Sequence, residues 1–250
     1  ALSVKVPKGM HFVLVGPSGT GKRVTRKHVI GIFKPDQGEV HVDGQDVPAM
    51  DHKQLMSLRK RMGYLFQNGA LINWLTVADN VGLPLKEHSK LARSEVDDRV
   101  HEVLKLVGMD HAAKQGPPDI SGGMKLRAGL ARALVTNPEY VLYDEPNAGL
   151  DPIISHQIHE LIAEVRDRLS VTGLIVTHSR ACATQCGDRI GILEAGKIGI
   201  EGSVEEITAS DHPPAGAFMG SGSDSSDTYV DRSRRDTLLG FVFFGTLGFL

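Results

Sequence analysis

The segment from Gly16 to Lys22 has the composition of a loop that can hold phosphate. It follows the apolar run from Met10 to Val15 and precedes a segment compatible with a helix. Glycines let backbone N–H groups point inward around phosphate oxygens, the helix offers its positive end, and the lysine can reach the outer phosphates of a nucleotide. A simple glycine turn is the alternative, and the flanking strand and helix argue against it. The candidate residues are Gly16, Pro17, Ser18, Gly19, Thr20, Gly21, Lys22 and Arg23.

Two neighbouring acids end a second apolar run. Asp144 and Glu145 directly follow Val141–Tyr143. At the end of a buried strand, Asp144 can hold Mg²⁺ or its water, and Glu145 can polarise an attacking water molecule. Paired acids at this position are often only a solvated strand end. The phosphate loop upstream favours the chemical interpretation.

A third motif, Ser121-Gly122-Gly123, begins an apolar helical segment. Two glycines at a helix start leave backbone amides uncovered, so an anion can approach them. Without the other motifs, this pattern indicates only a capped helix.

The apolar pattern predicts the elements that must position these groups. Short apolar runs at 10–15, 61–66, 140–143 and 174–177 are expected to be strands, and they alternate with helical segments. Such alternation predicts an α/β fold with a mainly parallel sheet covered on both faces. Asp43-Gly44 between valines predicts an antiparallel hairpin. Between Gln67 and Ser121 the spacing becomes helical, with Ser94 as the expected cap, which predicts a separate helical lobe.

Composition limits the choice of ligand and compartment. The 250 residues carry 28 Lys and Arg against 30 Asp and Glu, a formal net charge of −2. This balance gives no broad attraction to nucleic acid, so an anionic ligand must be held locally. The only cysteines, Cys182 and Cys186, complete no zinc pattern and are expected to be reduced in a cytosolic compartment.

Taken in order, the motifs resemble those of ABC transporter ATPases. The resemblance rests on the phosphate loop at 16–22, Gln67, Ser121-Gly122-Gly123, Asp144-Glu145, Leu150-Asp151 and His178. It covers residues 1–207 and implies a RecA-like P-loop core with an antiparallel β subdomain and an inserted α-helical subdomain at about 68–122. It also implies that the first strand of the family lies upstream of residue 1.

The same resemblance implies roles for individual residues. Glu145 would be the general base, His178 would clamp the γ-phosphate, and Gln67 would sense metal and nucleotide beside the metal-binding Asp144. Ser121, Gly122 and Gly123 would contact ATP bound by a second cassette, with Asp151 at the dimer contact. ATP and Mg²⁺ are therefore the expected cofactors, and two cassettes are expected to enclose two ATP molecules.

Three stretches are similar to ATPases that serve MCE-type (mammalian-cell-entry) lipid transport systems. They lie at 62–71, 76–81 and 121–125, and the Gly-Ala-Leu after Gln67 and the Met after Ser-Gly-Gly are the most specific features. This similarity implies a lipid transporter with a membrane permease and an MCE-domain lipid-binding protein as partners. It places the ATPase on the cytoplasmic face of the bacterial inner membrane. A soluble ABC ATPase without a permease is an alternative.

Arg23 departs from the family pattern, which has Ser or Thr directly after the loop lysine. That hydroxyl ligates Mg²⁺ in the family, and an arginine has no lone pair to offer a metal. We therefore expect hydrolysis to be impaired more than nucleotide binding. A nucleotide-binding subunit that hydrolyses poorly is the corresponding alternative function.

The C-terminal part has a different composition. Residues 208–237 are predicted to be a linker, because their Gly, Ser and Asp content cannot bury enough surface to fold alone. Residues 238–250 are apolar and follow three arginines, so they are predicted to begin a transmembrane helix that is cut short.

Overall fold

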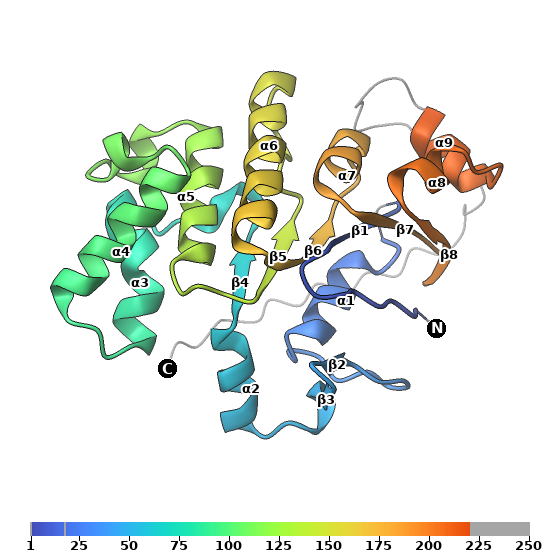
Figure 1. The fold of residues 1–250 in the computed structure, drawn as a ribbon, viewed down its shortest axis with the longest axis horizontal. Coiled ribbons are helices and arrows are strands. Elements are labelled where there is room, and N and C mark those ends of the chain that lie inside the picture. Colours follow the sequence, from blue (N-terminus) through green and yellow to red (C-terminus); the bar gives the residue numbers. More distant parts are fainter. Residues whose placement is uncertain (1, 18, 221–250) are drawn as a thin grey trace, which may run out of the picture.

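A six-stranded sheet in the order β4-β5-β6-β1-β7-β8 organises the molecule (Figure 1). The computed structural model describes residues 2–17 and 19–220. All neighbouring strands pair in parallel except β7 and β8, which are antiparallel. The predicted parallel core is confirmed, whereas the sequence had not indicated β7 and β8. The strands are β1 His11–Val15, β4 Met62–Leu65, β5 Tyr140–Asp144, β6 Thr172–Val176, β7 Arg189–Glu194 and β8 Lys197–Gly202.

Helices surround this sheet and also lie beside its two edge strands, β4 and β8. Helices α3, α4 and α5 pack on one another beside β4, whereas α8 lies beside β8 and α9 packs on α8 (Figure 1). The helices are α1 Lys22–Val29, α2 His52–Lys60, α3 Val77–His88, α4 Arg93–Leu106, α5 Gly122–Leu134, α6 Pro152–Leu169, α7 Arg180–Cys186, α8 Val204–Thr208 and α9 Pro213–Gly220. Short 3₁₀ turns are η1 Val47–Ala49, η2 Gln67–Ala70, η3 Asp110–Ala112 and η4 Pro117–Asp119.

The segment expected to be helical, about 68–122, contains α3 and α4. The expected cap Ser94 is wrong by two positions, because α4 begins at Arg93 and Ala92 occupies the cap position. Glu95 takes over the capping, since its Oε2 accepts the backbone N–H of Ala92 at 2.6 Å.

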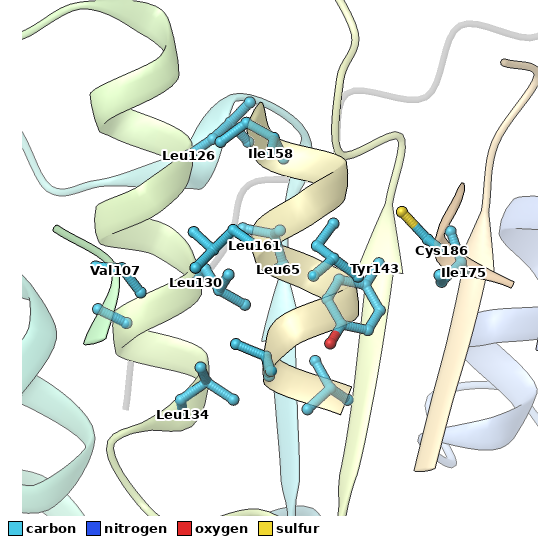
Figure 2. Packing of buried hydrophobic residues seen from close by; sticks show 14 of the residues in the cluster. Leu65, Val107, Leu126, Leu130, Leu134, Tyr143, Ile158, Leu161, Ile175 and Cys186 are labelled. Atoms are coloured by element: carbon cyan, nitrogen blue, oxygen red, sulfur yellow. The ribbon is translucent and has the colours of Figure 1, made fainter. Parts of the chain in front are cut away.

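The core forms where α5 and α6 pack against the sheet. Figure 2 shows Leu130 on α5 and Leu161 on α6 near Leu65 of β4, with Tyr143 of β5 beside them. Every residue of β1 is buried, as expected of a central parallel strand covered on both faces. This packing holds the carboxyl ends of the parallel strands at one rigid edge.

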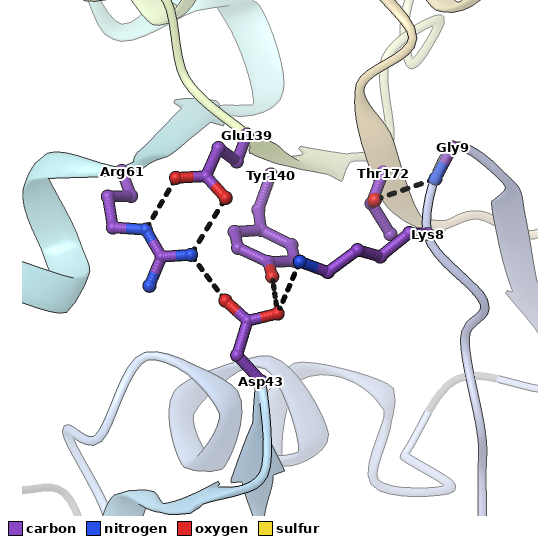
Figure 3. A network of polar contacts seen from close by, with 7 residues as sticks. All are labelled: Lys8, Gly9, Asp43, Arg61, Glu139, Tyr140 and Thr172. Atoms are coloured by element: carbon purple, nitrogen blue, oxygen red, sulfur yellow. Dashed lines mark hydrogen bonds and ion pairs between the residues drawn. The ribbon is translucent and has the colours of Figure 1, made fainter.

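The predicted Asp43-Gly44 turn joins β2 (His41–Val42) to β3 (Gln45–Asp46) as an antiparallel hairpin. The hairpin is tied to the sheet through the Asp43 carboxylate (Figure 3). Its Oδ1 accepts from the Tyr140 hydroxyl at 2.6 Å and pairs with Lys8 at 2.9 Å, while its Oδ2 pairs with Arg61. Arg61 also holds Glu139 through Nε at 2.6 Å. Tyr140, Lys8 and Arg61 together keep the pKa of Asp43 below its usual range, with the Tyr140 bond as the largest cause.

The linker predicted from residue 208 is wrong for its first part. Residues 213–220 form α9, in which Ala215 and Met219 are buried against the core. Pro213 and Pro214 begin this helix, where missing N–H groups cost nothing. The rest of the predicted linker, 221–237, and the predicted membrane segment, 238–250, lie outside the described residues. Within the described part of the chain, no helix is both long and apolar enough to cross a membrane.

The buried His11 predicts a pH dependence of stability. Its Nδ1 lies 3.2 Å from the carbonyl oxygen of Cys186, and burial, with a smaller effect of Arg166, lowers its pKa from 6.5 to about 4. The unfolded chain therefore binds one proton more than the folded chain between these two values. The contribution of neutral His11 to the free energy of unfolding is complete above pH 6.5 and is lost as the pH falls toward 4. It amounts to about 3 kcal/mol at most.

We expect a His11→Leu variant to show a flatter dependence of unfolding free energy on pH in this window. Urea denaturation of the parent and the variant at a series of pH values measures the difference. If the unfolding free energy changed equally with pH in the two proteins, His11 would not be the group that titrates. A loss of stability that is the same at every pH does not affect this comparison.

Candidate functional site

Four adjacent strands, β4, β5, β6 and β1, end at one edge of the sheet. The phosphate loop and the predicted residues Gln67, Asp144, Glu145 and His178 lie at or shortly after the ends of these strands. Gln67 lies shortly after β4, Asp144 and Glu145 end β5, and His178 follows β6. The phosphate loop follows β1. Since carboxyl ends of parallel strands share one edge, residues far apart in sequence are brought together there.

The phosphate loop is held against β7 by a close backbone approach. A Cβ at Gly16 would lie 2.5 Å from the carbonyl oxygen of Leu193, so only glycine fits. Thr20 Oγ1 donates to the Pro17 carbonyl at 2.8 Å. Lys22 Nζ donates to the carbonyl oxygens of Gly16 and Pro17, the latter at 2.8 Å, so the ammonium lies inside its own loop. Ser18 lies outside the described residues.

The N-terminus of α1 offers donors to an anion. Gly21 occupies the cap position with φ 105° and provides no side chain to bond the first amides of the helix. Lys22 beside it is buried. Burial is the largest effect on its ammonium and lowers the pKa, Glu145 opposes this, and Arg23 and Arg26 add to the lowering. The positive charges thus gather where a phosphate would be held.

Glu145 and His178 form a second pair at the edge. Glu145 has φ 47°, an uncommon conformation for a residue other than glycine, and its N–H donates to Val176 at 2.8 Å. Its Oε2 lies 2.9 Å from His178 Nδ1 and accepts the His178 N–H at 3.2 Å. Burial alone would raise the pKa of Glu145, but the bonds from His178 and Thr177 outweigh it and hold the pKa below the ordinary value. The carboxylate is therefore ionised and can accept a proton.

Asp144 has a partner that the sequence did not indicate. Its Oδ2 pairs with Nη1 of Arg26, whose residue is 3% exposed. Arg26 Nη1 also donates to the Tyr64 hydroxyl at 2.8 Å. Burial raises the pKa of Tyr64, so the hydroxyl stays protonated. Arg26 and Lys22, four positions apart, are the buried residues of α1, whereas Arg23 is exposed.

These residues, as placed, do not fit the expected Mg²⁺. The family's hydroxyl is replaced by Arg23, and a guanidinium already pairs with Oδ2 of Asp144, which leaves only Oδ1 without a partner among the described residues. Gln67, the other predicted metal residue, is exposed. Within the described ranges, no cluster of three or more His, Cys, Asp or Glu side chains could hold a metal ion.

The turn that carries Gln67 lies directly on α5. A Cβ on Gly129 would lie 2.8 Å from Cα of Gly69, so two glycines allow the backbones to touch. Arg132 then donates from Nη1 to Ala70 and from Nη2 to Gly69, both at 2.8 Å. Since α5 also packs on α3 and α4, it connects this turn to the helical lobe.

Ser121, Gly122 and Gly123 lie apart from the sheet-edge residues, at the start of α5. Ser121 caps the helix by accepting from Met124 at 3.3 Å, and Ser121 and Gly122 are exposed. A Cβ on Gly123 would lie 2.5 Å from Ile154 Cγ2, so glycine permits close packing on α6. Asp151 caps α6 by accepting from the N–H groups at Ile153 and Ile154, both at 3.0 Å. Its dimer role stays a prediction.

Two surface hollows lie at the opposite edge of the sheet and are separate from this site. One is lined by Gly9, Met10, Arg166, Asp167, Ser170 and Asp188, and the other lies beside Lys8 and Tyr140. Both lie near the amino ends of strands, and none of the predicted site residues lines either hollow within the described part of the chain.

Known proteins of related sequence give the context of this site. A family model described as "ABC transporter" matches residues 1–148. The "Probable ribonucleotide transport ATP-binding protein mkl" of Mycobacterium leprae is 41% identical over 87% of this chain and 63% of that protein. The "Intermembrane phospholipid transport system ATP-binding protein MlaF" of Escherichia coli K12 is 38% identical over 87% of this chain and 81% of that protein. The chain thus spans less than two thirds of the mycobacterial relative.

A solved structure supports the same fold. The ATP-binding cassette MJ0796, in a dimeric post-hydrolysis state bound to ADP and Pi, superposes with a TM-score of 0.73 at 30% identity. The match covers 81% of this chain and 88% of that chain.

Proposed function

This chain belongs to the ABC transporter family, and from that membership we propose that it is the ATP-binding and ATP-hydrolysing subunit of a transporter that moves lipid across the bacterial envelope. The observation that carries the proposal is the convergence of the phosphate loop, Glu145 and His178 at one edge of the sheet. The family match alone does not require these groups to meet.

The roles of the residues follow from their positions. The loop amides and Lys22 bind the phosphates of ATP, and the ammonium leaves the Gly16 and Pro17 carbonyls to do so. Glu145 accepts a proton from the water that attacks the γ-phosphorus, the bond to ADP breaks, and phosphate is released. His178, which pairs with the Glu145 carboxylate, orients it and contacts the γ-phosphate in this proposal.

A second copy of the chain completes the site in this proposal. Ser121, Gly122 and Gly123 are exposed or lie at an exposed helix start, so they can face ATP held by a partner cassette. The dimeric state of MJ0796 supports such an arrangement. A membrane permease on the cytoplasmic face of the inner membrane and an MCE-domain lipid-binding protein are the further proposed partners.

Lipid as the cargo rests on the three MCE-like stretches and on the similarity to MlaF. The mycobacterial relative has a name that specifies ribonucleotide transport, so these two cargoes need a direct test. The chain should be purified from its native membranes in mild detergent, and the permease that accompanies it should be reconstituted with it in liposomes. ATP-dependent movement of a fluorescent phospholipid, without movement of a labelled ribonucleotide, supports the proposal.

Three results would contradict it. Movement of the ribonucleotide alone would make the cargo wrong, and absence of any permease would favour a soluble ABC ATPase. ATP binding without measurable turnover would favour the alternative of a nucleotide-binding subunit that hydrolyses poorly.

A further inference from the structure

The ion pair between Arg26 and Asp144 places a fixed positive charge beside the phosphate loop. Arg26 lies one helical turn after Lys22 on the buried face of α1. Its guanidinium is bonded on one nitrogen to both Asp144 and Tyr64. The guanidinium carbon also lies 5.9 Å from the centre of the Tyr64 ring. Three contacts from two strands thus hold this one cation.

The bonding of the pair is incomplete. Arg26 Nε and Asp144 Oδ1 are buried, and neither has a hydrogen-bond partner among the described residues. Buried polar atoms without partners are rare, because each costs free energy. The guanidinium and the carboxylate therefore share one direct contact, and each retains one polar atom enclosed in the protein without a partner.

A divalent cation at Asp144 would lie next to the guanidinium, because Arg26 pairs with Oδ2 and only Oδ1 is without a partner among the described residues. Arg26 is 3% exposed, so water would screen the repulsion between the two positive charges only weakly. Displacing the guanidinium instead would leave a buried charge unpaired, which is strongly unfavourable. Arg23 supplies no oxygen in compensation, and the positive charges on Lys22, Arg23 and Arg26 repel a metal ion.

We propose that Arg26 acts as the built-in cation of this nucleotide site, so that the cassette binds metal-free ATP with no need for a divalent cation. The inference rests on the proposed function, since it assigns the form of the nucleotide that this ATP site accepts. The guanidinium supplies the positive charge near the β- and γ-phosphates and keeps Asp144 neutralised. Arg26 is thus a positioning residue that acts on the phosphates of ATP through its charge and through Asp144.

The test is the affinity for ATP with Mg²⁺ and with EDTA, measured by calorimetry on the full chain. We expect the parent's Kd values in the two buffers to agree within about twofold. In Arg26→Met, which retains a long apolar side chain, Asp144 is unpaired and repels the phosphates. We expect its affinity in EDTA to fall about tenfold or more, and Mg²⁺ to restore at least part of the loss.

Lys27→Gln is the matched control, because it removes one positive charge from an exposed position of the same helix. It should keep the parent's indifference to EDTA. Parent binding that weakens about tenfold or more in EDTA would overturn the inference, and this arm needs no variant to fold. Equal metal dependence in Lys27→Gln and Arg26→Met would also overturn it. Failure of the folded parent to bind ATP in either buffer would instead overturn the proposed function.

Discussion

Glu145→Gln is expected to lower ATP turnover by roughly 10²- to 10⁴-fold, the range for loss of a general base. The amide cannot accept the proton of the attacking water, whereas the phosphate loop that binds ATP is unchanged. Glutamine can still accept the His178 N–H through its carbonyl oxygen, so the local geometry is kept. The ATP-bound dimer should therefore accumulate, because hydrolysis normally ends it.

Phosphate release and size-exclusion chromatography with ATP measure the two effects. Glu87→Gln, at an exposed position of α3, is the control for the same chemical change outside the site. Turnover of Glu145→Gln equal to that of the control would refute the role of Glu145. A variant that stays monomeric with ATP at every protein concentration would refute the enclosed dimer.

The second large effect is expected from replacing two arginines together. Arg23→Ser supplies the hydroxyl that the family has at this position, but Asp144 remains paired with Arg26 in that single variant. Arg26→Met frees Asp144 without supplying the hydroxyl. We expect the double variant to release phosphate at least about tenfold faster than the parent when Mg²⁺ is present, and the gain to exceed the product of the single gains.

A double-mutant cycle of the parent, the two single variants and the double variant, each assayed with Mg²⁺ and with EDTA, separates these contributions. The increase should vanish in EDTA. If Arg23→Ser alone gave the full increase, Arg23 would be the sole obstacle and the Asp144 pair would be irrelevant to turnover. If the folded double variant equalled the parent, neither arginine would limit hydrolysis.

The order of motifs was sufficient to predict the family, the parallel core and the loop that holds phosphate. Local chemistry explains this success, since a glycine-rich loop between a strand and a helix has few other uses. The hairpin at Asp43-Gly44 and the cap at Ser121 were predictable for the same reason: each depends on neighbouring residues alone. The sequence did not indicate β7 and β8, because the periodicity of a short apolar run does not distinguish a strand from part of a helix.

Only the tertiary structure decided what surrounds Asp144. The sequence by itself determined that Asp144 ends a strand and that an arginine replaces the residue after Lys22. A motif relates only residues that are close in sequence, so the sequence indicated Arg23, which is exposed, as the unusual residue. Arg26 meets Asp144 because the register of β1, β6 and β5 brings α1 across from the end of β5, over more than a hundred residues of intervening chain. Such a contact depends on the packing of distant elements, so no local pattern could have predicted it.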